Sequence, residues 1–179
     1  MVRVFIAAEI PEVFRRDLRE VQDELKFSKA RLSFVDPEIA HITIKFIGEI
    51  SADKVVSIKK ALKEVEFSPY DISFRGVFFN KPSGPRVIWT SGNDEGKSSE
   101  LKSRIEDLLE PEGILREKRK FRPHVTLARI KKFHPSLAES VASLGNYDFG
   151  SFQVDSITLK SSILKPDGPV YDDLMEVSF

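Results

Sequence analysis

The 179-residue sequence contains no cysteine, only three histidines, and no apolar run that approaches the length of a membrane span. The lack of cysteine excludes disulfides, a thiolate nucleophile and a cysteine-ligated zinc site. A helix that crosses a membrane needs about 20 consecutive apolar residues, and the N-terminal apolar run is too short and wrongly flanked for a secretory signal. We therefore expect an intracellular, cytoplasmic protein that does not contact a membrane.

Neither sign of charge is in excess, because 28 Lys and Arg residues balance 28 Asp and Glu residues. This balance argues against a general polyanion binder, although a local basic groove remains compatible with it because such fields depend on how charges are arranged. Glycine-rich phosphate loops of the nucleotide-binding kind are absent, so no ATP site and no cofactor is expected. The length and the 41% apolar content fit one domain, or two small lobes that share a core.

Hydrophobic periodicity predicts alternating strands and helices. A helix should follow Pro11, with Phe14, Leu18, Val21 and Leu25 on one face, and Ser51 should cap a second helix. A third helix should open at Ser98 or Ser99, and a fourth, short helix should span 136–144. Strands are expected at 2–8, 31–35, 42–47, 70–79 and 86–91, around His124, and on both sides of the turn at 165–169.

The two halves of the chain match at a fixed offset of 83 positions. His41 and Thr43 map onto His124 and Thr126. Further pairs at this offset are Arg3 and Arg86, Val4 and Val87, Leu18 and Leu101, Leu25 and Leu108, and Ile47 and Ile130. Such a repeat determines architecture. It predicts one bilobal domain over 1–179, with repeats that start near Val2 and near Pro85, and a pseudo-two-fold axis that places the His-x-Thr strands across a cleft.

Each His-x-Thr motif places an imidazole and a hydroxyl on one strand face, because residues i and i+2 point the same way. Imidazole titrates near neutral pH and the hydroxyl can donate to an anionic oxygen. Two such pairs across a cleft suit a phosphodiester: one histidine takes a proton from water and the other protonates the leaving alkoxide. The candidate catalytic residues are therefore His41, Thr43, His124 and Thr126.

Simpler explanations exist for part of this pattern. Threonine is favoured in strands, and the segment SITLK at 156–160 repeats the apolar–Thr–apolar part with Ser156 in place of histidine. The histidines therefore carry the information. Zinc would need a third ligand, but neither strand places a carboxylate in register, and His134 lies outside the repeat beside Pro135, where we expect it to face solvent. We expect no metal.

The residues resemble a known family. Two His-x-Thr motifs, HITIKFIG and HVTLAR, together with MVRVFIAAEIP, FVDPEIAHITIKFIGE, RVIW and SSILKPDGPVY, are similar to the 2H phosphoesterase superfamily, and within it to the RNA 2′,3′-cyclic phosphodiesterases, also called 2′-5′ RNA ligases. The resemblance implies an α+β fold of two pseudo-symmetric lobes, with antiparallel sheets that line a central cleft and helices outside. It implies opening of a cyclic phosphate to a 2′-phosphate without metal or ATP, with His41 as proton donor and His124 as proton acceptor, although near-symmetry leaves their order open.

Three further features are candidates for substrate binding. Arg129 lies five residues after His124, so only a twist or bulge would bring its guanidinium to the phosphate. Phe46 is its equivalent in the first half and could stack on a base, or belong to the core. The basic run REKRKFR at 116–122 could follow an RNA backbone, or form a solvated loop.

Two other functions compete with cyclic phosphate hydrolysis. The same residues could join a 2′,3′-cyclic phosphate to a 5′-hydroxyl as a 2′-5′ bond. A non-catalytic RNA-binding module is the other alternative, but a pure binder needs no matched imidazoles. The expected partner is RNA with 2′,3′-cyclic phosphate ends, such as tRNA fragments, and the expected state is a monomer.

Overall fold

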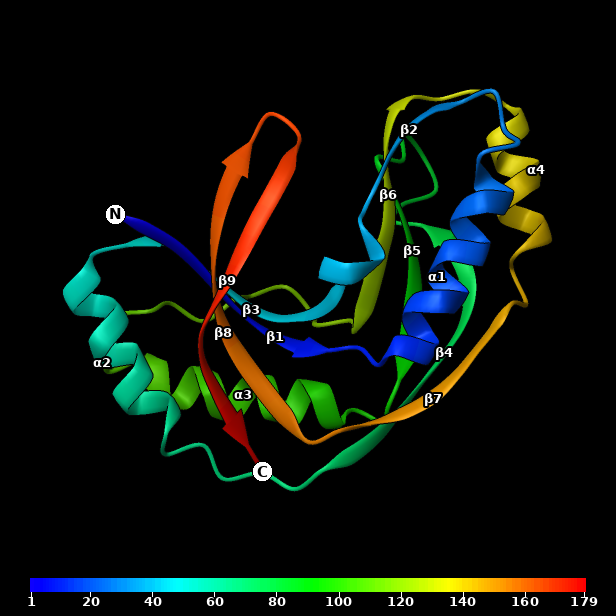
Figure 1. Ribbon diagram of the computed structural model, residues 1–179. Helices are drawn as coiled ribbons and strands as arrows, with labels where there is room; N and C mark the ends of the chain where they lie inside the picture. Colours follow the sequence, from blue (N-terminus) through cyan, green and yellow to red (C-terminus); the bar gives the residue numbers. More distant parts are fainter.

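The computed structural model describes residues 1–179 as an α+β fold (Figure 1). The nine strands are β1 (Val2–Glu9), β2 (Arg31–Phe34), β3 (His41–Ile50), β4 (Tyr70–Phe79), β5 (Val87–Asn93), β6 (His124–Lys132), β7 (Asp148–Val154), β8 (Ser156–Lys165) and β9 (Gly168–Ser178). The helices are α1 (Glu12–Leu25), α2 (Ala52–Leu62), α3 (Lys97–Leu109) and α4 (Ser136–Ser143), with a 3₁₀ turn at Pro37–Ile39.

The strands form two antiparallel groups. Their order is β7-β4-β5-β6 followed by β3-β1-β8-β9, and β2 adds to the free side of β6. The two groups meet at a single pair, Ile42 with Val125, between β3 and β6. Because β3 and β6 are the two His-x-Thr strands, the pseudo-two-fold relation runs through this pair, and the expected architecture of two lobes is confirmed.

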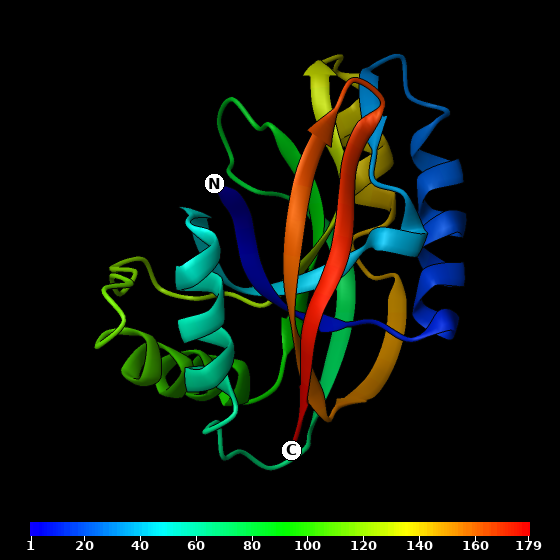
Figure 2. The ribbon, with the colours of Figure 1, turned by 60° about the vertical axis from the view of Figure 1, so that its left-hand side comes forward.

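The helices lie outside the strands, and the two halves of the chain cross over. Helices α1 and α4 contact β4, β6 and β7, whereas α2 and α3 pack on each other and α3 contacts β3. Figure 2 shows these two helix pairs on opposite sides of the strands. Strand β4 of the first half pairs with β5, and β8 of the second half pairs with β1. Each lobe is therefore built from both halves of the sequence.

Local sequence accounts for most of the elements. The α1 face predicted from periodicity, Phe14, Leu18, Val21 and Leu25, is buried. The Ser51 side chain accepts a hydrogen bond from the backbone N–H of Lys54 at 3.2 Å, which caps α2. One continuous cluster of buried apolar side chains runs through both lobes. No helix is long and apolar enough to cross a membrane.

Two element predictions need correction. Helix α3 begins at Lys97 instead of Ser98 or Ser99, because Asp94 accepts hydrogen bonds from the backbone N–H groups of Gly96 and Ser98, both at 3.0 Å. Strand β7 was not predicted. It is an edge strand that pairs only with β4, and Gly150 at φ +76° interrupts its regular geometry.

The constant offset of 83 is correct only for the His-x-Thr strands. Phe5 pairs with Phe46 while Val87 pairs with Arg129, so Phe5 corresponds to Val87, an offset of 82. The buried positions of α1 recur in α3 at an offset of 84, as Gln22 and Glu106 do. The sequence matches of Arg3 with Arg86 and of Leu18 with Leu101 are therefore one residue out of structural register.

Candidate active site

The four motif residues lie on one side of the β3–β6 pair. Ile42 and Val125 are paired and fully buried, so their chain neighbours point to the opposite face. His41, Thr43, His124 and Thr126 all line one cavity of about 340 Å³. Because the strands are antiparallel, His41 lies opposite Thr126 of the neighbouring strand, at one end of the Ile42–Val125 pair. His124 lies opposite Thr43, at the other end of that pair. Each imidazole therefore has a hydroxyl from the other half of the chain nearby.

Both histidines are held in the same way by the backbone. Nδ1 of His41 donates to the carbonyl of Ile39 at 2.9 Å, and Nδ1 of His124 donates to the carbonyl of Arg122 at 2.8 Å. A carbonyl only accepts, so each Nδ1 carries a proton and each Nε2 is left for chemistry. Nε2 of His41 lies 3.1 Å from the hydroxyl oxygen of Thr43.

Aromatic side chains cover both imidazoles. The ring of Phe5 stacks on His41 at 4.9 Å between centroids, and Tyr171 meets the same imidazole edge-on at 5.4 Å. Trp89 lies 4.3 Å from the ring of His124. Burial lowers the pKa of His41 and of His124 below the usual histidine value, because it disfavours the imidazolium. The neutral form of the imidazole is therefore favoured at either position relative to water.

A β-bulge brings Arg129 into the cavity. Ile88 pairs with Ala128 but Trp89 pairs with Thr126, so Leu127 is an extra residue in β6. The bulge shifts the alternation by one position, and Arg129 lines the cavity beside the two histidines. The odd separation of five that follows from the sequence is thus compatible with a contact to the same substrate.

The equivalent bulge in β3 does not bring Phe46 into the cavity. Ala7 pairs with Thr43 and Ile6 with Lys45, so the extra residue lies at Ile44. The ring of Phe46 is exposed, and the guanidinium of Arg3 lies 5.0 Å from its centroid. It belongs neither to the core nor to the cavity lining.

The remaining candidates lie elsewhere. His134, expected to face solvent, is half-buried, and its Nδ1 accepts from the backbone N–H of Ser136, the first residue of α4, at 3.1 Å. In the basic run 116–122, Arg116 pairs with Asp107 and Glu110, whereas the four basic residues from Lys118 to Arg122 have no carboxylate partner. Asp36 and Asp167 are the acidic residues of the cavity lining. No group of three or more His, Asp or Glu side chains is placed to hold a metal ion.

Sequence reasoning missed one wall of the cavity. The turn of the β8–β9 hairpin supplies Asp167, Gly168, Pro169 and Tyr171. Strand β8 reaches the cavity by pairing with β1, more than 150 positions away in the chain. The hairpin could be predicted from the KPDGP turn, but its position over His41 had no local signal.

This arrangement, two lobes joined at paired His-x-Thr strands, defines a phosphoesterase of the two-histidine type. The family model of LigT-like phosphoesterases matches the chain over residues 9–89 and 93–171, one stretch in each half. The chain belongs to the LigT-like phosphoesterase family.

The relatives of this chain match it over nearly its whole length. A protein of Archaeoglobus fulgidus named RNA 2′,3′-cyclic phosphodiesterase is 36% identical, covering 97% of this chain and 98% of its own. One of the same name from Aeropyrum pernix is 37% identical, covering 89% and 93%. The crystal structure of a Thermus thermophilus protein superposes with a TM-score of 0.77 at 30% identity, covering 98% and 97%. Escherichia coli LigT in complex with 3′-AMP shares the fold, with a TM-score of 0.79 at 20% identity over 99% and 97%.

Proposed function

We propose that this protein hydrolyses the 2′,3′-cyclic phosphate at the end of an RNA chain and leaves a 2′-phosphate. The observation that carries the proposal is the pair of His-Thr sets on two adjoining strands, with both Nε2 atoms free of backbone partners and all four side chains in one cavity. The names of the relatives from A. fulgidus and A. pernix support the choice of substrate.

The reaction needs one proton acceptor and one proton donor. Nε2 of His124 takes a proton from water as the water oxygen bonds to phosphorus. The bond from phosphorus to the 3′-oxygen breaks, and Nε2 of His41 gives that oxygen its proton. Thr43, Thr126 and Arg129 donate to the non-bridging oxygens, where charge grows in the transition state. Solvent then returns both histidines to their starting states, so no step requires a metal ion or ATP.

The test uses a matched series of substitutions in all three histidines. Asparagine keeps a side-chain polar group near the position of Nδ1 and removes Nε2. The substrate is an oligoribonucleotide that ends in a 2′,3′-cyclic phosphate, supplied with EDTA and without ATP. We expect His41→Asn and His124→Asn to lower kcat by at least about 100-fold each, and His134→Asn to change it less than about twofold.

The identity of the product completes the test. A 2′-phosphate, distinguished from a 3′-phosphate by its ³¹P resonance, agrees with departure of the 3′-oxygen. A 3′-phosphate, or full activity in His41→Asn, would refute the proposed mechanism. Ligation runs through the same atoms, and the formation of a joined 2′-5′ product when a 5′-hydroxyl oligonucleotide is added would make it the favoured function.

We further propose that the protein acts as a monomer in the cytoplasm on RNA fragments such as cleaved tRNA. The cavity contains both histidines within one chain, so the chemistry needs no second copy. The lack of cysteine is consistent with a reducing compartment.

A further inference from the structure

Three segments of the chain contain basic residues and no acidic ones. Residues 118–138 carry seven Lys and Arg, residues 72–93 carry three, and residues 25–35 carry three. Not one Asp or Glu occurs in them, although the whole chain has 28 of each sign. Such segregation in a chain of zero net charge creates a local field that composition alone does not reveal.

The fold brings these three segments together. They contain β6, β4 with β5, and β2, and these strands are neighbours in one lobe, since β5 pairs with both β4 and β6 and β2 pairs with the other side of β6. Helices α1 and α4 pack against this lobe from outside. The face without helices therefore combines charges from segments that lie far apart in the sequence. We call the face formed by β2, β5 and β6 the basic wall.

The cations of these segments are free to bind a ligand. Apart from Lys26, which pairs with Asp23, none lies within 4.0 Å of a carboxylate. Elsewhere the structure pairs many of its basic residues, among them Arg19, Lys45 and Lys160. Cations without a carboxylate partner are thus a shared feature of these three segments.

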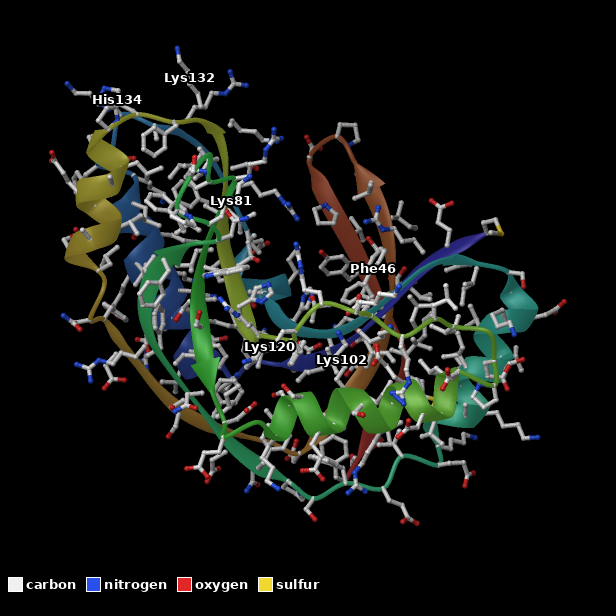
Figure 3. The ribbon with its side chains drawn as sticks, turned by 180° about the vertical axis from the view of Figure 1, so that it is seen from behind. Phe46, Lys81, Lys102, Lys120, Lys132 and His134 are labelled. Carbon is white, nitrogen blue, oxygen red and sulfur yellow. The ribbon has the colours of Figure 1, made fainter.

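The register shows which of these cations face the cavity side. Ser33 pairs with Arg129, and both line the cavity. Arg31 lies two residues before Ser33 in β2, so it lies on the same face. Lys131 is an extra residue in β6, and this second bulge pairs Lys132 with Arg31, so the pair continues that face toward the tip of the lobe. In Figure 3, Lys132 lies at this tip and Lys81 of the β4–β5 loop lies on the same lobe.

The opposite wall has the reverse charge. In the hairpin region 161–176, one lysine, Lys165, stands against four acidic residues, which are Asp167, Asp172, Asp173 and Glu176. Asp173 pairs with Lys160 of β8, and the other three have no basic partner. Asp167 lines the cavity, at the hairpin turn. A polyanion that leaves the cavity along this hairpin would meet like charge, whereas one that leaves along the basic wall would meet unpaired Lys and Arg.

We propose that the RNA chain upstream of the cyclic phosphate lies along the basic wall, with its phosphates between Arg129 and the tip residues Lys81, Arg31 and Lys132, while the hairpin contacts only the terminal nucleotide. The strand from His124 to Lys132 extends about 25 Å at about 3.3 Å per residue, enough for several nucleotides. This inference rests on the proposed function, and it adds a direction to the bound chain.

The experiment compares a 2′,3′-cyclic mononucleotide with a ten-residue oligonucleotide that ends in the same cyclic nucleotide. The variant is Lys81→Glu with Lys132→Glu. The control is Arg16→Glu with Lys60→Glu, which makes the same charge change at exposed, unpaired positions on the helices α1 and α2. For the decamer we expect the tip variant to raise KM about tenfold or more and to lower the slope of log(kcat/KM) against log[salt] by about 1.4.

The mononucleotide and the control separate the outcomes. The tip variant should change kcat/KM for the mononucleotide less than about twofold, and the control should change KM for the decamer less than about threefold. Equal losses in the tip variant and the control, or equal KM values for the two substrates in the unaltered protein, would overturn the basic-wall proposal while cyclic phosphate hydrolysis stands. Failure of the unaltered protein to hydrolyse either substrate would instead overturn the proposed function.

Discussion

At the scale of single residues, the backbone decides which nitrogen of each histidine is available for the proposed reaction. The carbonyls of Ile39 and Arg122 hold the Nδ1 protons of His41 and His124. Each carbonyl belongs to the residue two positions before its histidine, so the same local geometry recurs in both halves. The neutral rings are thereby fixed as the tautomer whose Nε2 accepts a proton. An acid and a base can then be made from two chemically matched groups that differ only in protonation.

The pH dependence of the reaction follows from the burial of these rings. Burial lowers the pKa of both histidines, and in the proposed mechanism the active form of the free enzyme has one imidazole protonated and one neutral. We therefore expect kcat/KM, which reports the free enzyme, to peak below about pH 6.5. The bound phosphodiester anion favours imidazolium, so the kcat profile should peak at higher pH than the kcat/KM profile. Initial rates between about pH 4.5 and 9 test this, and a kcat/KM maximum above about pH 7 would contradict it.

At the scale of elements, each His-x-Thr strand carries a bulge that a polar side chain from a helix secures. In β6, the carbonyl of the bulge residue Leu127 accepts from Nε2 of Gln22 in α1 at 3.0 Å. In β3, Lys45 directly after the bulge points inward and its ammonium lies 2.7 Å from Glu106 in α3. Gln22 and Glu106 occupy equivalent helix positions. The bulges turn residues 46 and 129 to the motif face, so these helix contacts support the geometry of the site.

The buried Lys45–Glu106 pair should be costly to break. Lys45 is only 1% exposed and also donates to the carbonyl of Leu115 at 2.8 Å. Although burial acts in the opposite direction, the hydrogen bond from Lys45 lowers the pKa of Glu106. We expect Lys45→Met to reduce the free energy of unfolding by about 3–5 kcal/mol, because it leaves a buried carboxylate without its cation. Lys60→Met on the surface of α2 should cost less than about 0.5 kcal/mol.

Urea unfolding at about pH 7.5 measures both variants, and the pH dependence adds a second check. A carboxyl group with a lowered folded pKa stabilises the fold above its unfolded pKa, and this contribution is lost as the pH falls through the folded value. The difference between the unaltered protein and Lys45→Met should therefore shrink toward acid pH. A loss below about 1 kcal/mol near neutral pH would show that the pair does not support the bulge.

The sequence allowed prediction of those elements and residues that depend on local pattern. The amphipathic face of α1, the Ser51 cap, and the placement of His41 and Thr43 on one strand face follow from periodicity and capping chemistry. The bulges, the pairing of β8 with β1 and the position of Tyr171 depend on contacts between distant segments, and local pattern is silent on them. The offset of 83 holds only for β3 and β6. The one-residue shifts in β1 and α1 could not be seen in the sequence, because apolar residues still match there at an offset of 83.

At the scale of the whole molecule, the crossover makes the two halves interdependent. Helix α1 of the first half packs on β6 and β7 of the second half, and β8 of the second half pairs with β1. The apolar core is one cluster that includes Leu62 of α2 and Leu137 of α4, which lie in different lobes. Neither half can bury its apolar faces alone, so the lobes should unfold together as one domain over 1–179.

The single tryptophan gives a direct test of this cooperativity. Trp89 lies in β5, in the lobe covered by α1 and α4, and packs 4.3 Å from His124. Leu62→Ala removes buried surface from the other lobe and should cost about 2–5 kcal/mol. If the lobes unfold as one unit, Leu62→Ala must lower the urea midpoint seen by Trp89 fluorescence as much as the midpoint seen by far-UV circular dichroism. Leu137→Ala, the matched substitution in the lobe of Trp89, should shift both probes equally as well. Independent lobes would instead give a biphasic dichroism curve for Leu62→Ala with an unchanged Trp89 midpoint. The cavity, which takes one histidine from each lobe, would then be lost before the lobe of Trp89 unfolds.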